Sequence, residues 1–284
     1  MKLPINFQFN QSNLQDFVDC RRRFQLKHLL HLAWPAVEAE PVLENERLIE
    51  LGSRFHHLVH QYLLGIPLSE LKIPEQEEEL ALWWQHFQSA IADGGELHNA
   101  WLPSTNRYPE ITLAGRLGDI RLVAKVDLIA VYSDGTIQIF DWKTTQHVPR
   151  RAWLTERLQS KVYPYLLTKA GAFLNKEQPI SPDQVEMIYW YPAVPDTLMR
   201  IPYSQKQYQA DSTYLHSLLD TLLHLKEDEF PMTSDEQHCK FCVYRSLCNR
   251  GITAGQLIDF ENSTSIGEDD TFDIDFSQID EISF

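Results

Sequence analysis

The sequence predicts an α/β protein built around a mixed sheet. Segments with helical periodicity fill most of the first hundred residues, and runs of alternating apolar residues follow between 108 and 142. A further helical segment then separates these strands from two later ones. The resulting order, α-α-α-β-β-β-α-β-β-α, favours a sheet with helices packed against its faces.

Three helices are predicted before any strand. The first spans 12–32 and begins with Ser12 and Gln15, which fit a capping box. The second spans 43–64, and the third spans 75–93 and stops at a pair of glycines. These helices place the start of the sheet late in the chain.

The strands of the middle region are predicted at 108–114, 119–131 and 136–142. Asp134 and Gly135 separate the last two, as in an antiparallel hairpin.

The last third of the domain is predicted to return to the sheet. A helix covers 151–170 and contains Pro164, which predicts a kink. The segments 185–191 and 198–203 are predicted to form a second strand pair, followed by a helix over 205–226. We expect one domain over residues 1–250 and an acidic, disordered tail over 251–284.

Charge and hydropathy constrain location and partners. The net charge of −15 by itself argues against nucleic acid, but nine acids and no Lys or Arg lie in 251–284, so more than half of that charge belongs to the tail. No apolar run reaches the ~18 residues of a membrane span. The first residues lack the pattern of a secretory signal. We therefore expect a cytoplasmic protein that does not enter a membrane.

The predicted hairpin carries the most chemically informative residues. Asp127 lies on its first strand, and Asp141, Trp142 and Lys143 end its second. Side chains alternate along a strand, so Asp141 and Lys143 share a face and Trp142 points away. Carboxylates bind hard cations such as Mg²⁺ or Mn²⁺, and a lysine beside them can hold an attacking water or offset charge on a phosphoryl oxygen. An Asp-x-Lys triplet also occurs at ordinary solvated strand ends.

The four cysteines form a second candidate site. Cys239, Cys242 and Cys248 have the spacing C-x2-C-x5-C, and Cys20 lies in the first predicted helix. Disulfides are not expected in a cytosolic chain. Four thiolates suit either structural zinc or a [4Fe–4S] cluster, and their chemistry alone favours zinc.

The order of these motifs resembles the RecB-like branch of the PD-(D/E)XK nucleases. The resemblance covers Gly52-Ser-Arg-Phe-His56, Asp127, Asp141-Trp-Lys143 and Gln159-Ser-Lys-Val-Tyr163, with Glu110 matching an acid on the preceding strand. It implies a restriction-endonuclease-like fold. It also implies a Mg²⁺ or Mn²⁺ site formed by His56, Asp127, Asp141 and the Trp142 carbonyl, with Glu110 as a further ligand.

The resemblance also implies roles for the remaining residues. Lys143 would assist the attacking water, and Gln159 and Tyr163 would lie beside the DNA path. The cysteines look like the iron–sulfur staple of AddB-type and CRISPR-associated RecB-like nucleases, which reverses the preference for zinc.

Two functions remain open at this point. One is a Mg²⁺- or Mn²⁺-dependent deoxyribonuclease, most simply a single-strand exonuclease of DNA repair or recombination. The other is a non-catalytic DNA-binding or scaffold subunit of a helicase–nuclease or CRISPR adaptation complex. The retained catalytic-type residues favour the nuclease. The sequence has no P-loop of the form GxxxxGK[ST], so unwinding would need a helicase partner.

Overall fold

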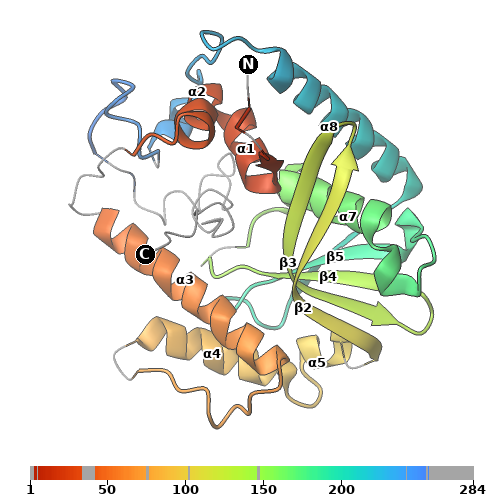
Figure 1. The fold of residues 1–284 in the computed structure, drawn as a ribbon. Helices are drawn as coiled ribbons and strands as arrows, with labels where there is room; N and C mark the ends of the chain where they lie inside the picture. Colours follow the sequence, from red (N-terminus) through yellow and green to blue (C-terminus); the bar gives the residue numbers. More distant parts are fainter. Residues whose placement is uncertain are drawn as a thin grey trace, which may run out of the picture.

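A computed structural model gives the fold of the chain (Figure 1). It describes residues 3–4, 6–33, 42–74, 77–101, 103–145, 148–240, 242–253 and 255. The predicted tail over 251–284 lies outside the described residues except for 251–253 and 255. Within the described ranges, no helix combines the length and the apolarity needed to cross a membrane.

A six-stranded mixed sheet forms the centre of the molecule. Its strands are β1 (Gln8–Phe9), β2 (Ser104–Leu117), β3 (Ile120–Tyr132), β4 (Ile137–Trp142), β5 (Val185–Trp190) and β6 (Leu198–Pro202). The order is β1-β3-β4-β5-β6, and β2 pairs with β3. The pairs β1–β3 and β4–β5 are parallel and the other three are antiparallel. The predicted mixed α/β fold is therefore confirmed.

Helices cover both faces of this sheet. They are α1 (Gln11–Asp19), α2 (Arg21–Phe24), α3 (Val42–Leu63), α4 (Glu78–Ile91), α5 (Glu96–Trp101), α6 (Arg151–Glu156), α7 (Leu158–Ala170) and α8 (Gln205–His224). Four short helices complete the set: the π-helix η1 (Gln25–Leu29) and the 3₁₀ helices η2 (Ala172–Asn175), η3 (Pro182–Gln184) and η4 (Glu236–Cys239). In Figure 1, α3, α4 and α5 lie on the opposite side of the sheet from α7 and α8.

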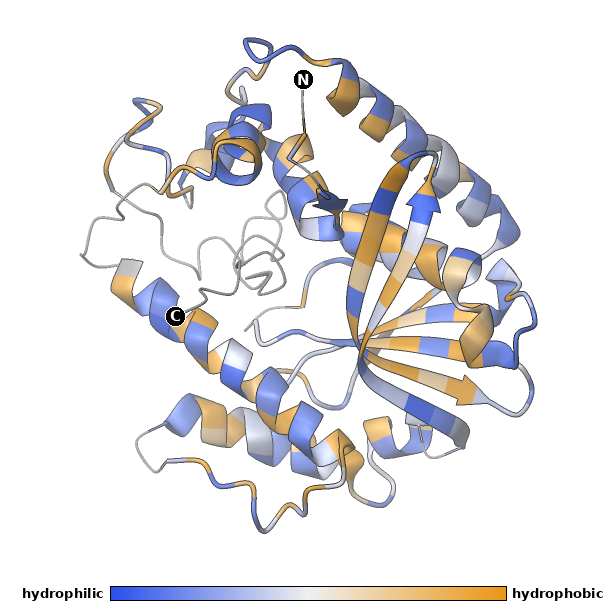
Figure 2. Cartoon of the chain, in the orientation of Figure 1, coloured by the Kyte–Doolittle hydropathy of each residue, from blue (hydrophilic) through white to orange (hydrophobic). Residues whose placement is uncertain are grey.

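Each face of the sheet has its own hydrophobic core. Ile137 and Ile139 of β4 join the core under α7, whereas Phe140 and Trp142 join the core under α3, α4 and α5. This alternation is what a strand buried on both faces produces. Figure 2 shows the hydrophobic residues concentrated on the strands and on α7. The strand β4 is therefore fixed from both sides at the point where it reaches Asp141.

The two longest strands change face where Glu110 and Asp127 meet. Ala124 and Val126 of β3 belong to the core under α7, and two positions of opposite parity, Ile129 and Val131, belong to the same core. Alternation along β3 thus shifts by one residue at Asp127. On the partner strand Glu110 has φ of +50°, in the left-handed region that non-glycine residues rarely adopt.

Two predicted helices are broken in the structure. The helix predicted over 12–32 ends at Asp19, because Cys20 is extended (φ −157°, ψ 106°), and α2 begins afresh at Arg21. The helix predicted over 151–170 is interrupted at Arg157 (ψ 144°) rather than at Pro164, which lies inside α7. Apolar periodicity continues across both breaks and so conceals them.

Two smaller predictions are also wrong. The capping box at the start of α1 consists of Asn10 and Asn13, whose side chains each accept from the other's backbone amide, and not of Ser12 and Gln15. The sheet does not begin after three helices, because β1 precedes them. A two-residue strand is too short to produce a recognisable alternation.

Candidate active site

The predicted hairpin brings Asp127 and Asp141 together. β3 and β4 are antiparallel, with Leu128 opposite Phe140 as the last pair on this side, so Asp127 and Asp141 occupy the next position along. The amide of Trp142 donates to Asp127 Oδ2 at 2.9 Å. At the other end the strands turn through Asp134 and Gly135, where the glycine has φ of +87°, as an Asp-Gly hairpin requires.

His56, Glu110 and Asp127 form a group of three candidate metal ligands. One ligand atom from each lies within 4.8 Å of the other two. The three residues come from α3, β2 and β3, so elements from both ends of a 72-residue stretch meet here. His56 Nδ1 lies 3.3 Å from Asp127 Oδ1, and Lys125 Nζ lies 2.6 Å from Glu110 Oε2. An imidazole and two carboxylates are a donor set that suits Mn²⁺ or Mg²⁺.

The ionisation of this group reflects its crowding. Burial by itself lowers the pKa of His56, but the negative charges of Asp127 and then Asp141 outweigh it, and the pKa of His56 is raised. Burial likewise works against ionised Asp127, yet His56, the Trp142 amide and Lys143 hold the pKa of Asp127 below its ordinary value. The negative charges gathered around His56 thus favour positive charge at this position, as a bound cation would supply.

Asp141 lies beside this group and contacts one polar side chain, Gln159, and one cationic side chain, Lys143. Gln159 Nε2, in the first turn of α7, donates to Asp141 Oδ1 at 2.7 Å. Lys143 Nζ lies 3.1 Å from Asp141 Oδ2. Asp141 is 4% exposed, and a buried carboxylate is stable only with such partners. Three of the predicted site residues, Asp141, Lys143 and Gln159, thus lie together in the structure.

Tyr189 is a residue of this region that sequence reasoning missed. It lies on β5 directly beside Asp141, and Lys143 Nζ sits 5.9 Å from the centre of its ring. Its hydroxyl is 2.7 Å from Ser160 Oγ and 3.5 Å from Gln159 Oε1. The only sequence signal was its place in a strand predicted to be apolar.

Two further predicted site residues, Tyr163 and Trp142, lie in the cores on either side of the sheet. Tyr163 is 3% exposed and packs in the core under α7, so it supports the site from within; its place beside DNA stays a prediction. Trp142 contacts Asp127 through its amide, and metal binding by its carbonyl also stays a prediction. Asp141 lies outside the group of three ligand atoms, whereas Glu110 lies within it.

The four cysteines, here called the cysteine clasp, come from the two ends of the domain. Arg22 N donates to Pro231 O at 3.2 Å, and Tyr244 Oη donates to Leu32 O at 2.9 Å, so the first and last segments lie side by side. Burial is the main cause that raises the pKa of Cys242, to about 11. Burial and then the thiol of Cys20 also raise the pKa of Cys239 and Cys248. Cys20 is thus close enough to influence the other three.

The cysteine sulfurs do not form a group as tight as that of His56, Glu110 and Asp127. Among the described residues, which include all four cysteines, only His56, Glu110 and Asp127 place three ligand atoms within 4.8 Å.

Two arginines near the clasp are internal. Arg23 is buried against Asp16 and Asp19. Arg245 is buried and donates to the carbonyl oxygens of Cys242 and Ile252. These arginines hold the protein together and are not available to bind a phosphate backbone.

A carboxylate–histidine group beside an Asp-x-Lys motif, at one end of a mixed sheet, is the arrangement of a divalent-metal hydrolase. The chain belongs to the PD-(D/E)XK nuclease superfamily, whose family model matches residues 8–249. This makes the protein a nuclease by family, with DNA as the implied substrate and divalent metals as the implied cofactors.

Solved structures of similar fold are remote in sequence. The crystal structure of SSO0001 is 12% identical with a TM-score of 0.41, and the match covers 87% of this chain and 88% of that one. A candidate exonuclease from Eubacterium rectale is 11% identical with a TM-score of 0.47, over 83% of this chain and 91% of that one. Both likenesses are too distant to carry a functional conclusion. No curated protein matches the sequence.

Proposed function

We propose that this protein is a Mg²⁺- or Mn²⁺-dependent deoxyribonuclease that degrades single-stranded DNA from an end, in repair or recombination. The observation that carries the proposal is the meeting of His56, Glu110 and Asp127 with the neighbouring Asp141 and Lys143. The order of the motifs, which resembles that of RecB-like nucleases, supports DNA ends as the substrate.

The side chains divide the work of phosphodiester hydrolysis. His56, Glu110 and Asp127 would hold the metal, with Asp141 completing the site from β4. When bound, the metal supplies positive charge to the phosphoryl group and lowers the pKa of water. Lys143 carries a fixed positive charge 3.1 Å from Asp141, where it can orient the attacking water and offset charge on the phosphoryl oxygens. Gln159 fixes the Asp141 carboxylate so that it keeps one orientation.

The substitutions Asp141→Asn and Lys143→Met test this assignment. Each keeps the shape of the side chain but removes its charge, and each should lower the rate of Mn²⁺-dependent DNA cleavage by about 10³-fold or more. End-labelled single-stranded DNA measures the rate. Lys169→Met is a matched control, because Lys169 bonds Tyr165 at the far end of α7, and it should cleave like the wild type. Full activity of both site variants would contradict the proposal.

Whether cleavage requires a free DNA end is a separate question, and a second pair of substrates tests it. Linear and covalently closed circular single strands of the same sequence are compared. A single-strand exonuclease degrades the linear strand and leaves the circle intact. Equal cleavage of both would show endonuclease action while leaving the metal site assignment in place.

We further propose that the cysteine clasp holds a [4Fe–4S] cluster. Four thiols from two distant segments fit such a cluster in number, and the order of the motifs resembles that of nucleases with an iron–sulfur staple. Anaerobic purification should yield a brown protein absorbing near roughly 400 nm, with iron and sulfide bound. Stoichiometric zinc without iron in the same preparation would contradict the cluster. A helicase or CRISPR-associated partner stays a prediction of the resemblance.

A further inference from the structure

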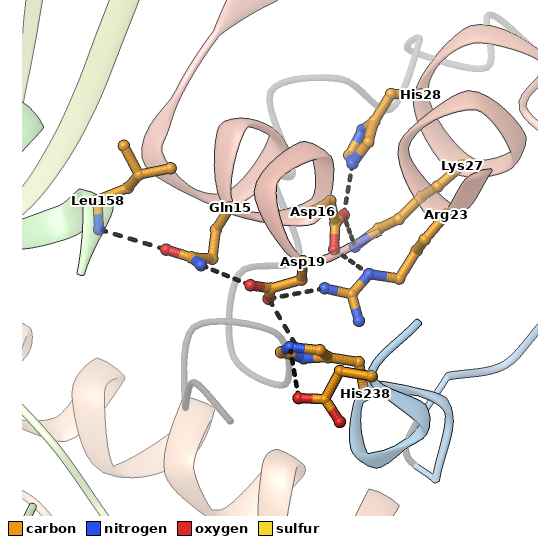
Figure 3. A network of polar contacts seen from close by, with 9 residues as sticks. Gln15, Asp16, Asp19, Arg23, Lys27, His28, Leu158 and His238 are labelled. Carbon is orange, nitrogen blue, oxygen red and sulfur yellow. Dashed lines mark hydrogen bonds and ion pairs between the residues drawn. The ribbon is translucent and has the colours of Figure 1, made fainter. Parts of the chain in front are cut away.

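A chain of polar contacts runs from Asp19, the residue before Cys20, to Leu158 in the first turn of α7 (Figure 3). Gln15 of α1 lies at its middle. Gln15 Oε1 accepts from the amide of Leu158 at 3.3 Å, and Gln15 Nε2 donates to Asp19 Oδ1 at 2.8 Å. Asp19 Oδ2 accepts from Arg23 at 3.0 Å and lies 3.9 Å from His238 Nδ1. The amide of Gln15 therefore has one defined orientation.

Gln15 caps α7 from another helix. The first amides of a helix have no partner within it, and the residue at the N-cap position, Arg157, carries a guanidinium that cannot accept a hydrogen bond. Gln15 supplies the missing acceptor across a separation of 143 residues. It thereby fixes the turn of α7 whose next residue, Gln159, donates to Asp141.

Asp19 bonds Gln15 beside the N-terminal side of the clasp and lies 3.9 Å from His238 on the C-terminal side. Asp19 precedes Cys20 in sequence, and His238 precedes Cys239. Asp19 is 8% exposed and Gln15 is 5% exposed, so water does not readily replace the bonds between them. Arg23 balances the charge of Asp19 and also binds Asp16 at 2.6 Å.

We propose that Gln15 is a positioning residue, which sets the first turn of α7 so that Gln159 holds Asp141, and which makes that position depend on the closed clasp through Asp19. For its effect on catalysis this inference rests on the proposed nuclease function. The structural link itself can be measured whether or not the protein cleaves DNA.

Native-state hydrogen exchange of the full chain tests the link first. Gln15→Met keeps the length and volume of the side chain and removes both hydrogen bonds. Exchange of the amides in 158–162 should become faster by on the order of tenfold, the factor of one buried hydrogen bond. Gln25→Met is the matched control, because the side chain of Gln25 bonds Arg22 and, in the C-terminal segment, Glu227 O. Wild-type exchange in 158–162 of the Gln15→Met variant would overturn the proposal.

Steady-state kinetics provide a second test, because substitution of a purely structural residue would not lower kcat selectively while leaving KM unchanged. Gln15→Met should lower kcat by on the order of tenfold with KM within about twofold, since the bond affects Asp141 and not the DNA surface. Gln25→Met should leave both constants near the wild type. An equal fall of kcat in both variants would show a general loss of folding and would contradict a positioning role.

Reversing the polarity of the bond provides a rescue. Gln15→Glu alone sets two carboxylates against each other and should reduce kcat and protection of 158–162. Adding Asp19→Asn makes position 19 the donor and position 15 the acceptor, while the total charge stays the same. The double variant should recover protection and kcat. A double variant no better than Gln15→Glu would contradict a direct bond between these positions.

Opening the clasp tests the dependence on Asp19. Cys239→Ser should accelerate exchange in 158–162 in the wild-type background and have little further effect in the Gln15→Met background, since the link is already cut. Equal acceleration in both backgrounds would overturn the route through Gln15.

Discussion

Glu110 shows how one residue combines backbone strain with a chemical role. Its φ of +50° places it in the left-handed region within a β-strand, which costs a residue with a Cβ atom about 1–2 kcal/mol. Its carboxylate is also one of the three grouped candidate metal ligands. The strain occurs where β2 and β3 change face, and it directs the side chain of Glu110 toward His56 and Asp127.

We expect Glu110→Gly to separate stability from activity. Glycine adopts positive φ without strain, so the free energy of unfolding should stay equal or rise by up to about 1 kcal/mol. Metal-dependent cleavage should fall, because a ligand is lost. Urea unfolding and Mn²⁺ titration of the cleavage rate measure the two effects. A loss of several kcal/mol in the free energy of unfolding would contradict this prediction, because it would show that the Glu110 side chain stabilises the fold.

Tyr189 provides a second test at the level of a residue. Its hydroxyl lies between Ser160 and Gln159, and its ring lies below Lys143. Tyr189→Phe keeps the ring and should lower kcat by roughly three- to tenfold through Gln159. Tyr203→Phe is a control, because it removes another buried hydroxyl, bonded to Asp211, far along the chain from β4. A greater loss of activity in the control would exclude a specific role for Tyr189.

At the scale of elements, α7 lies close against β2 at Gly115. A Cβ atom at Gly115 would lie 2.9 Å from Leu166 Cδ2 and 3.6 Å from Ala170 Cβ. Gly115 thus lets α7 settle on the sheet, and the position of α7 determines where Gln159 meets Asp141.

Gly115→Val should destabilise the protein by about 1–3 kcal/mol through overpacking. Ala114→Val, at the exposed neighbouring position on the other face of β2, should be within about 0.5 kcal/mol of the wild type. Denaturant unfolding of the two variants compares them directly. Shortening the facing side chain with Leu166→Val should recover part of the loss at Gly115.

The elements that could be predicted from the sequence are those determined by a local pattern, such as a turn motif or an alternation of apolar residues. The hairpin around Asp134 and Gly135 and the shared face of Asp141 and Lys143 follow from turn chemistry and alternation alone. The breaks at Cys20 and Arg157 do not, because each is an extended residue between two helical segments whose apolar pattern runs on. Such breaks are set by tertiary contacts, as the bond from Gln15 to Leu158 shows.

The candidate site was predicted by the types of its residues more than by their geometry. Asp127, Asp141, Lys143 and His56 could be identified because their motifs occur together. Tyr189 could not be, since its contacts depend on the register of β4 and β5. The internal position of Arg23 could not be seen either, because a run of arginines does not reveal which of them faces buried acids.

At the scale of the whole molecule, a buried cluster of charges stabilises the N-terminal helices. Asp16 lies 2.6 Å from Arg23, 3.1 Å from Lys27 and 2.6 Å from His28 (Figure 3). Burial opposes the charge of Asp16, but Arg23, Lys27 and His28 outweigh it and hold the pKa of Asp16 well below its ordinary value. Burial lowers the pKa of His28, despite the opposing effect of Asp16.

This cluster predicts loss of stability in acid. Both groups bind fewer protons in the folded than in the unfolded state, so the free energy of unfolding falls as the pH decreases. The contribution of His28 should be lost below about pH 6.5, and that of Asp16 below about pH 3.8. Urea midpoints at several pH values measure the slope. His28→Gln should flatten the curve above pH 5 and leave the steeper acid limb; an unchanged curve would contradict the assignment to His28.

The contact between the two ends of the domain has a consequence for the order of events during synthesis. Gln25 bonds Glu227 and Leu32 bonds Tyr244, so these contacts span 202 and 212 residues. At ~5–20 residues per second, a ribosome needs roughly 10–40 s to make the intervening chain. Until then Cys20 cannot meet the other three cysteines of the clasp. We therefore expect the clasp to close only after the last of these cysteines has been made, late in synthesis.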